Sequence, residues 1–142
     1  MVHLVKLCVG IESLNQLAQR LEWRVAEAPK GQPALTHVTR MFPKRGAELL
    51  DGGSLYWVIK GAIRARQRIV ALDEVTGSDG IRRCRIVLDD VLIATKNQPR
   101  RPFQGWRYLA DDDAPADIGP YEPHGDDMPE EMRADLVRLG LL

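Results

Sequence analysis

The sequence of 142 residues has little of what metal sites and disulfide scaffolds require. It contains two cysteines, Cys8 and Cys84, which lie far apart and without CxxC spacing, and its three histidines do not cluster. Structural zinc sites need closely spaced ligands, and disulfide scaffolds need several cysteines that can pair. We therefore expect no metal and no cofactor, and we interpret both cysteines as small buried side chains.

Long apolar runs and nucleotide-binding motifs are also missing. No stretch approaches the ~18 apolar residues of a membrane span, and the first residues lack the charged-then-apolar layout of a signal peptide. The sequence contains no G-x-x-x-x-G-K-[ST], G-x-G-x-x-G or G-x-S-x-G motif, which argues against the common nucleotide hydrolases. We expect a cytoplasmic protein that does not enter a membrane.

Charge is present in equal amounts of both signs, but its distribution is uneven. Residues 1–35 carry four Lys/Arg against three Asp/Glu, residues 36–107 fourteen against seven, and residues 108–142 two against ten. The three regions therefore have net charges of +1, +7 and −8. A basic body with an acidic tail indicates a polyanionic partner, a tail that folds back over the basic face, or both.

Short β-rich segments dominate the pattern of apolar residues. We expect strands over 3–9, 35–41, 54–60, 91–95 and 103–109, and a hairpin formed by 63–72 and 81–88. One helix begins after Ser13, an N-cap with Gln16 three positions on, and a short one covers 47–50. Without regular β-α-β alternation, this pattern predicts an α+β fold, a small curled mixed or antiparallel sheet or open β-barrel with two or three helices.

The chain length predicts one compact domain followed by a distinct tail. We expect a single α+β domain over 1–109 and an acidic, proline-rich linker over 110–127, which contains three consecutive aspartates. A C-terminal helix over 128–142, with Met132, Leu136 and Leu139 on one stripe, would dock on the domain or extend it.

The candidate binding residues come from an alternation of arginine with apolar residues. A period of two places Arg64, Arg66 and Arg68 on one face of a strand and Ile63, Ala65 and Ile69 on the other. In the partner strand Cys84, Ile86 and Leu88 would face inward, with Arg83 and Arg85 outward beside the first three arginines. Because arginine binds phosphate bidentately and stacks on bases, this pattern favours a nucleic-acid ligand.

Further cations and aromatic residues extend this candidate site. Trp106 and Tyr108 are candidate stacking partners, since single-stranded nucleic acids bind to platforms of aromatic and cationic side chains. The other candidates for phosphate contacts are Lys44, Arg45 and Lys60. The alternative interpretation is an ordinary solvated strand face, salt-bridged to Asp73, Glu74 or the acidic tail, with Trp57 and Trp106 in the core.

Four segments carry a resemblance to a known family. The sequence resembles the small bacterial family called domain of unknown function 1489 over nearly the whole chain up to about residue 115. The family has no assigned activity, so the resemblance implies no reaction or ligand. The segments that carry it are residues 36–45, 53–61, 65–69 and 101–109.

The order of elements is also similar in layout to small RNA-binding barrels of the PUA and ASCH type. That resemblance implies RNA or a modified nucleobase as ligand. Some ASCH-like proteins are amidohydrolases that use a lysine, a threonine and a glutamate, a set that Lys60, Thr39 and Glu48 would imitate. Fold alone does not determine function, so this analogy is one hypothesis among several.

Three functional hypotheses follow. The first is a module that binds RNA or a nucleotide-like polyanion through the arginine-rich strand face, with the acidic tail as a competing intramolecular partner. The second is an amidohydrolase acting on a modified nucleobase. The third is a protein-interaction module that uses the acidic tail and C-terminal helix. The sequence leaves the oligomeric state open.

Overall fold

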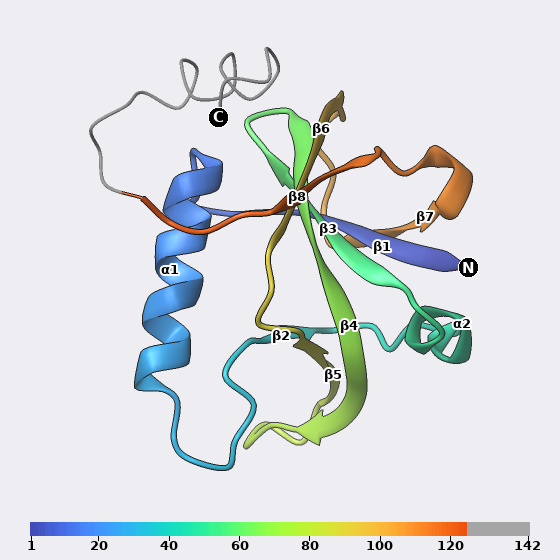
Figure 1. Cartoon of the computed structure of the whole chain (residues 1–142). Helices are drawn as coiled ribbons and strands as arrows, with labels where there is room; N and C mark the ends of the chain where they lie inside the picture. Colours follow the sequence, from blue (N-terminus) through green and yellow to red (C-terminus); the bar gives the residue numbers. More distant parts are fainter. Residues whose placement is uncertain (125–142) are drawn as a thin grey trace.

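The computed structural model describes residues 1–124, which form a curled, open sheet with a long helix on one side (Figure 1). The helices are α1 (Leu14–Glu27) and α2 (Gly46–Leu50), and a 3-10 turn covers Asp111–Asp113. The α+β class and the small curled sheet predicted from the sequence are confirmed. The strands are β1 (Val2–Leu7), β2 (Thr36–Thr39), β3 (Ser54–Ile59), β4 (Ala62–Thr76), β5 (Arg82–Leu88), β6 (Ile93–Pro99), β7 (Trp106–Ala110) and β8 (Asp117–Pro120).

Strand β4 organises the sheet. Its first half pairs with β3 and β6, and its second half pairs with β5, so the chain bends along this one long strand (Figure 1). The strand order is β2-β5-β4-β3-β1-β7, with β6 joining β4 to β8. Strands β1 and β3 are parallel and the other pairs are antiparallel. The described residues contain eight strands, where the sequence predicted six or seven.

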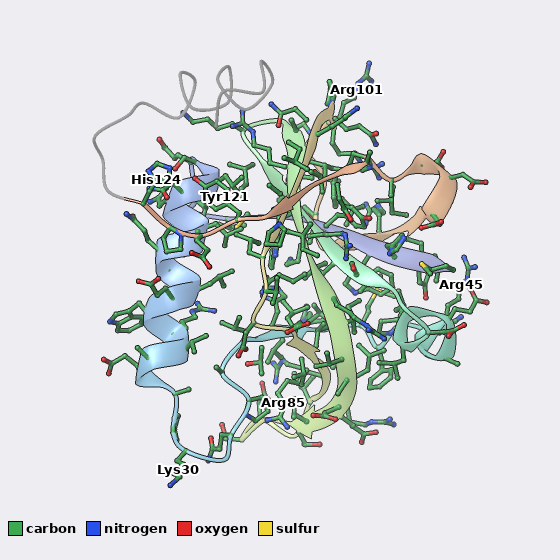
Figure 2. All side chains as sticks on the ribbon, in the orientation of Figure 1. Lys30, Arg45, Arg85, Arg101, Tyr121 and His124 are labelled. Atoms are coloured by element: carbon green, nitrogen blue, oxygen red, sulfur yellow. The ribbon has the colours of Figure 1, made fainter. Side chains whose placement is uncertain are left out.

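The additional strand lies within the predicted acidic linker. Strand β8 pairs with β6, so this part of residues 110–127 belongs to the sheet. Beyond it, the buried Asn15 of α1 holds the backbone of His124 at two points: its Nδ2 donates to the carbonyl at 2.9 Å and its Oδ1 accepts from the N–H at 3.0 Å. Figure 2 shows Tyr121 and His124 beside α1. The predicted C-terminal helix over 128–142 lies outside the described residues.

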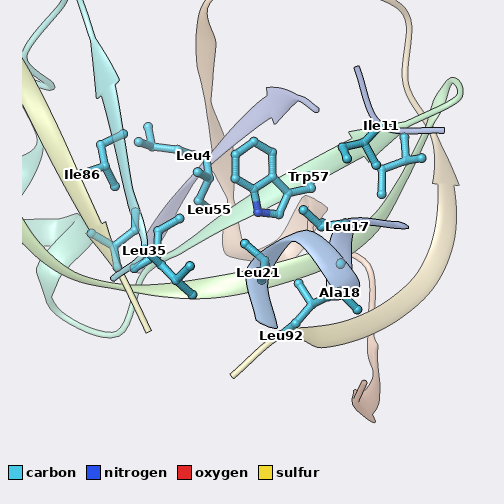
Figure 3. Close-up of a cluster of buried hydrophobic side chains, with 14 of the residues drawn as sticks. Leu4, Ile11, Leu17, Ala18, Leu21, Leu35, Leu55, Trp57, Ile86 and Leu92 are labelled. Carbon is cyan, nitrogen blue, oxygen red and sulfur yellow. The ribbon is translucent and has the colours of Figure 1, made fainter. Parts of the chain in front are cut away.

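Helix α1 begins where the sequence predicts and covers one face of the sheet. The Ser13 hydroxyl accepts a hydrogen bond from the Gln16 N–H at 3.0 Å, which satisfies one of the free donors of the first turn. Its apolar stripe, which includes Leu17 and Leu21, packs on Leu4, Leu55 and neighbouring strand residues in the main core (Figure 3). Burial of this stripe fixes the position of α1 against the sheet.

Trp57 lies in this main core, as the sequence predicted, and is 7% exposed (Figure 3). Its indole N–H donates to Gln67 Oε1 at 2.9 Å, and Gln67 Nε2 donates to the Asp89 carbonyl at 3.0 Å. The buried polar groups are thus paired, as burial requires. Cys84 is buried and Cys8 half-buried, and desolvation raises the pKa of each thiol to about 11, so both are protonated at neutral pH.

The opposite face of the sheet is covered as well. Val5, Tyr56, Val58 and Leu109 form a second, smaller core on that side, with Ala114 from the segment after β7 packed against it. Strand β3 is therefore buried on both faces, which explains its nearly continuous apolar sequence. The two faces carry different polar sites, which are described in turn below.

Candidate nucleic-acid interface

The predicted arginine alternation holds over only part of β4. Trp57 pairs with Ala65 and Val58 with Ile63, so Arg64 is the extra residue of a β-bulge. Ile63 consequently packs in the second core with Val58, on the other side from Ala65. The prediction that Ile63 shares a face with Ala65 and Ile69 is therefore wrong. The prediction that Arg64 continues the line of Arg66 and Arg68, which we call the arginine row, is wrong as well. The alternation holds from Ala65 to Ile69.

The arginines of the two strands do not converge. Arg85 pairs with Asp73 and Arg83 with Val75, both in the second half of β4, whereas Arg66 and Arg68 lie opposite β3 in the first half. Cys84, Ile86 and Leu88 do face inward, as predicted. The expected shared surface of five arginines is nevertheless not formed, because Arg83 and Arg85 of β5 lie opposite the second half of β4, whereas the other three arginines lie in its first half.

Carboxylates occupy most of these guanidinium groups. Arg66 donates through Nε and Nη2 to Asp117 at 2.9 and 2.8 Å, and this pairing raises the pKa of Arg66 and lowers that of Asp117. Arg83 donates to Asp79 at 2.8 Å, which lowers the pKa of that carboxyl to about 2, and Arg85 donates to Asp73 at 3.0 Å. Arg68 is exposed and has no ion pair within residues 1–124.

The remaining predicted cations lie at the periphery. Figure 2 shows Arg45 on a different side of the molecule from Arg85. Lys60 is exposed in the two-residue turn between β3 and β4, with a φ of 49°. The proposed set of Lys60, Thr39 and Glu48 is not brought together: Glu48 lies on α2, before the start of β3, and Lys60 follows its end (Figure 1). Lys44 is exposed next to Arg45.

A different group of cations and aromatic rings does converge, on the side of the sheet that carries α1. Lys6 of β1 lies in register between Trp57 of β3 and Trp106 of β7. The His37 ring from β2 meets Trp57 edge-on, with ring centroids 5.8 Å apart. We call this group the cation–aromatic surface; it consists of Lys6, Arg24, His37, Trp106 and Tyr108, and the buried Trp57 lies beneath it.

Tyr108 links this surface to the segment before α2. Its ring meets Trp106 edge-on at 5.0 Å between centroids, and its hydroxyl accepts the Arg45 N–H at 3.1 Å. The Arg45 guanidinium lies 5.4 Å from the ring centroid, in cation–π range, and also donates to Glu48 at 2.8 Å. Trp106 and Tyr108 are half-buried, so each ring packs on the core while part of it remains accessible.

The electrostatics of this surface differ from those of the arginine row. Burial, together with the repulsion of the imidazolium by Lys6 and Arg24, lowers the pKa of His37 to about 4. Three cations, Arg20, Arg24 and Lys6, act to lower the pKa of the nearby Cys8 thiol against the larger effect of burial. No carboxylate contributes to either shift, and within residues 1–124 neither Lys6 nor Arg24 forms an ion pair. Within residues 1–124, the charges that shift the pKa of His37 and of Cys8 are therefore all positive.

Lys6, Arg24 and His37 were missed as binding residues in the sequence. The sequence does contain a pattern that identifies Lys6. Alternation along β1 places it on the same face as Leu4, and a lysine on an otherwise apolar face indicates that its charged end reaches solvent or a binding partner. Arg24 gives no such signal, since an exposed arginine near a helix end is common. In the part of the chain that the structure describes, no three His, Cys, Asp or Glu side chains gather as metal ligands.

Comparison with known proteins identifies the family. The family described as "Protein of unknown function (DUF1489)" matches residues 4–142. No curated protein and no solved structure matches the chain, so the resemblance in layout to PUA and ASCH domains is not confirmed. No helix within residues 1–124 has the length and apolar character to cross a membrane. From the match over nearly its whole length, we conclude that the chain belongs to the DUF1489 family of proteins of unknown function.

Proposed function

We propose that this protein binds single-stranded RNA across the cation–aromatic surface. The observation that carries the proposal is the convergence of Lys6, Arg24 and His37 beside Trp106 and Tyr108, where the charges of residues 1–124 that shift the His37 pKa are all positive. A surface with both cations and accessible rings is suited to single-stranded RNA, in which phosphates alternate with bases along the chain. Lys6 and Arg24 would contact phosphates, and Trp106 and Tyr108 would stack on bases.

The shape of the surface favours stacking over insertion of a base. The cavity beside Trp57, lined also by His37, Arg24 and Leu21, has a volume of about 30 Å³, which corresponds to about one water molecule. A nucleobase does not fit such a volume, so the contacts with bases would be made on the rim. Recognition through ring faces tolerates every base, and we therefore expect weak sequence preference.

Salt dependence is the first test of the proposal. Two phosphate contacts on a single strand give a slope of about −1.4 in log K against log salt, because each contact releases condensed counterion. Affinity for an oligouridine of about twelve nucleotides should then fall about sevenfold between 50 and 200 mM salt. Fluorescence anisotropy of the labelled oligonucleotide measures this. Salt-insensitive binding, or no binding at 50 mM salt, would contradict the proposal.

The proposal also predicts a pH dependence that resides in His37. In the free protein this imidazole has a pKa of about 4, because burial and the cations Lys6 and Arg24 disfavour its charged form. Phosphates bound at those cations would raise the His37 pKa, so binding would take up a proton and strengthen as the pH falls. We expect affinity for oligouridine, whose base does not titrate here, to rise about five- to tenfold from pH 7.5 to 5. The variant His37→Gln should show a flat profile, and an unchanged slope in that variant would exclude His37 as the origin.

A further inference from the structure

A second cavity lies on the face of the sheet opposite the cation–aromatic surface. Its volume is about 330 Å³, within the range of small-molecule sites. It is lined by Tyr56 and Arg66 from the sheet, His3 from β1, and Asp111, Ala114 and Asp117 from the segment after β7. Neither the arginine row nor the proposed RNA-binding surface accounts for this cavity.

The hydrogen bonds of His3 fix the charge of one wall. His3 is 3% exposed, and its Nδ1 accepts the Ser54 backbone N–H at 3.0 Å. The ring proton of the neutral form must therefore be on Nε2, which donates to Asp111 Oδ1 at 2.8 Å. A neutral imidazole orients the Asp111 carboxylate without compensating its charge, and the Asp111 side chain is 57% exposed.

On the other wall of the cavity, the charges of Arg66 and Asp117 cancel each other. Arg66 holds Asp117 through two hydrogen bonds, and its Nη1 donates to the Ser54 hydroxyl at 2.9 Å. Three of its five N–H groups are thus committed to groups of the protein. Asp111 is therefore the carboxylate of the cavity lining that has no cationic side chain as its partner within residues 1–124.

Tyr56 provides the observation that points to a ligand. The residue is 4% exposed, lines the cavity, and packs edge-on against His3 with 5.0 Å between ring centroids. No hydrogen bond of its hydroxyl is found within residues 1–124, and the hydroxyl is not one of the solvent-inaccessible unpaired atoms there, so it is open to the cavity that Tyr56 lines. Desolvation raises the pKa of Tyr56, and the charges of Arg66, Asp117 and Asp111 act on its hydroxyl.

We propose that this cavity binds a small organic cation, a primary ammonium or guanidinium compound. The N–H groups of the cation would donate to the free oxygen of Asp111 and to the Tyr56 hydroxyl oxygen. An anionic ligand is disfavoured because the guanidinium of Arg66 is already occupied by Asp117. The proposal is independent of RNA binding, since it uses the opposite face of the sheet and none of the residues of the cation–aromatic surface.

Agmatine, which carries a guanidinium at one end and an ammonium at the other, is a suitable probe. Isothermal titration of the full chain with agmatine should give a 1:1 isotherm, and Tyr56→Phe and Asp111→Asn should each weaken binding at least tenfold. Both changes preserve shape, and the asparagine oxygen still accepts from His3, so the fold should persist; thermal unfolding of each variant verifies this. The matched control is Asp112→Asn, which removes the same charge from an exposed neighbour outside the cavity lining.

Two results would overturn this inference. Absence of heat on titration with agmatine would exclude the site for this class of ligand. An equal loss of affinity in Asp112→Asn and Asp111→Asn would show that agmatine is attracted only by the general acidity of this segment. Because neither variant alters the cation–aromatic surface, RNA binding should be unchanged in both, and the two proposals can fail separately.

Discussion

Reversal of two charges on the cation–aromatic surface should lower affinity for single-stranded RNA at least about 100-fold. In the variant Lys6→Glu/Arg24→Glu, two phosphate contacts are replaced by repulsion, and hydrogen bonds to charged groups contribute about 1.5–3 kcal/mol each. Both positions lack an intramolecular ion pair within residues 1–124, so no salt bridge of the fold is lost. Anisotropy with oligouridine at 50 mM salt measures the change.

The matched control for this variant is Lys60→Glu/Arg68→Glu. It changes the net charge by the same amount, at two exposed cations that the sequence analysis placed in the binding site. We expect a loss of no more than about threefold, from the general field of the protein alone. If the control loses more affinity than Lys6→Glu/Arg24→Glu, the RNA-binding site lies on the arginine row and the location proposed above is wrong. Because Lys6 is half-buried, Lys6→Gln/Arg24→Gln repeats the test without adding buried charge.

The substitution Gly53→Ala should destabilise the fold by at least about 3 kcal/mol. A Cβ at this position would lie 2.5 Å from two backbone oxygens, those of Leu49 and Val2. Backbone atoms of α2 and β1 cannot move aside as a flexible side chain can. Gly53 also donates its N–H to the Leu49 carbonyl at 2.8 Å and accepts from the Ile69 N–H at 3.0 Å, so a displaced backbone would lose both hydrogen bonds.

Gly46→Ala is the control for this prediction. A Cβ there would meet only the tip of the Leu72 side chain at 3.3 Å, and alanine is the better residue in a helix. We expect a change within about 1 kcal/mol. Urea unfolding followed by circular dichroism measures both variants. A Gly53→Ala protein as stable as Gly46→Ala would show that the close approach of α2, β1 and β3 is not as described.

Local patterns predicted the elements of this fold well. The Ser13 cap, the apolar stripe of α1 and the inward positions Cys84, Ile86 and Leu88 are where the sequence places them. These features depend on contacts between residues close in the sequence, or on the period of a single strand. Spacing alone therefore determines them, whatever partner strand is nearby.

The register of the strands, and the meeting of side chains from different elements, could not be predicted in the same way. The bulge at Arg64 and the bend of β4 depend on three partner strands, and they separate arginines that a straight hairpin would bring together. Strand β8 has four residues, including a glycine and a proline, and gives no strand pattern in the sequence; it pairs with the edge of β6. Lys6, Arg24 and His37 come from three elements, so only the tertiary fold places them on one surface.

The three tryptophan indole groups allow the most direct test of where RNA binds. Trp106 lies on the cation–aromatic surface, and Trp57 is buried beneath it. Trp23 lies on α1, is 63% exposed and does not belong to this surface. In a ¹⁵N NMR titration with oligouridine, we predict large shifts of the Trp106 indole and of the Lys6 and Tyr108 amides, with Trp23 and the Arg83 and Arg85 amides unchanged. Shifts confined to the β4 and β5 arginines, with Trp106 unaffected, would contradict the account.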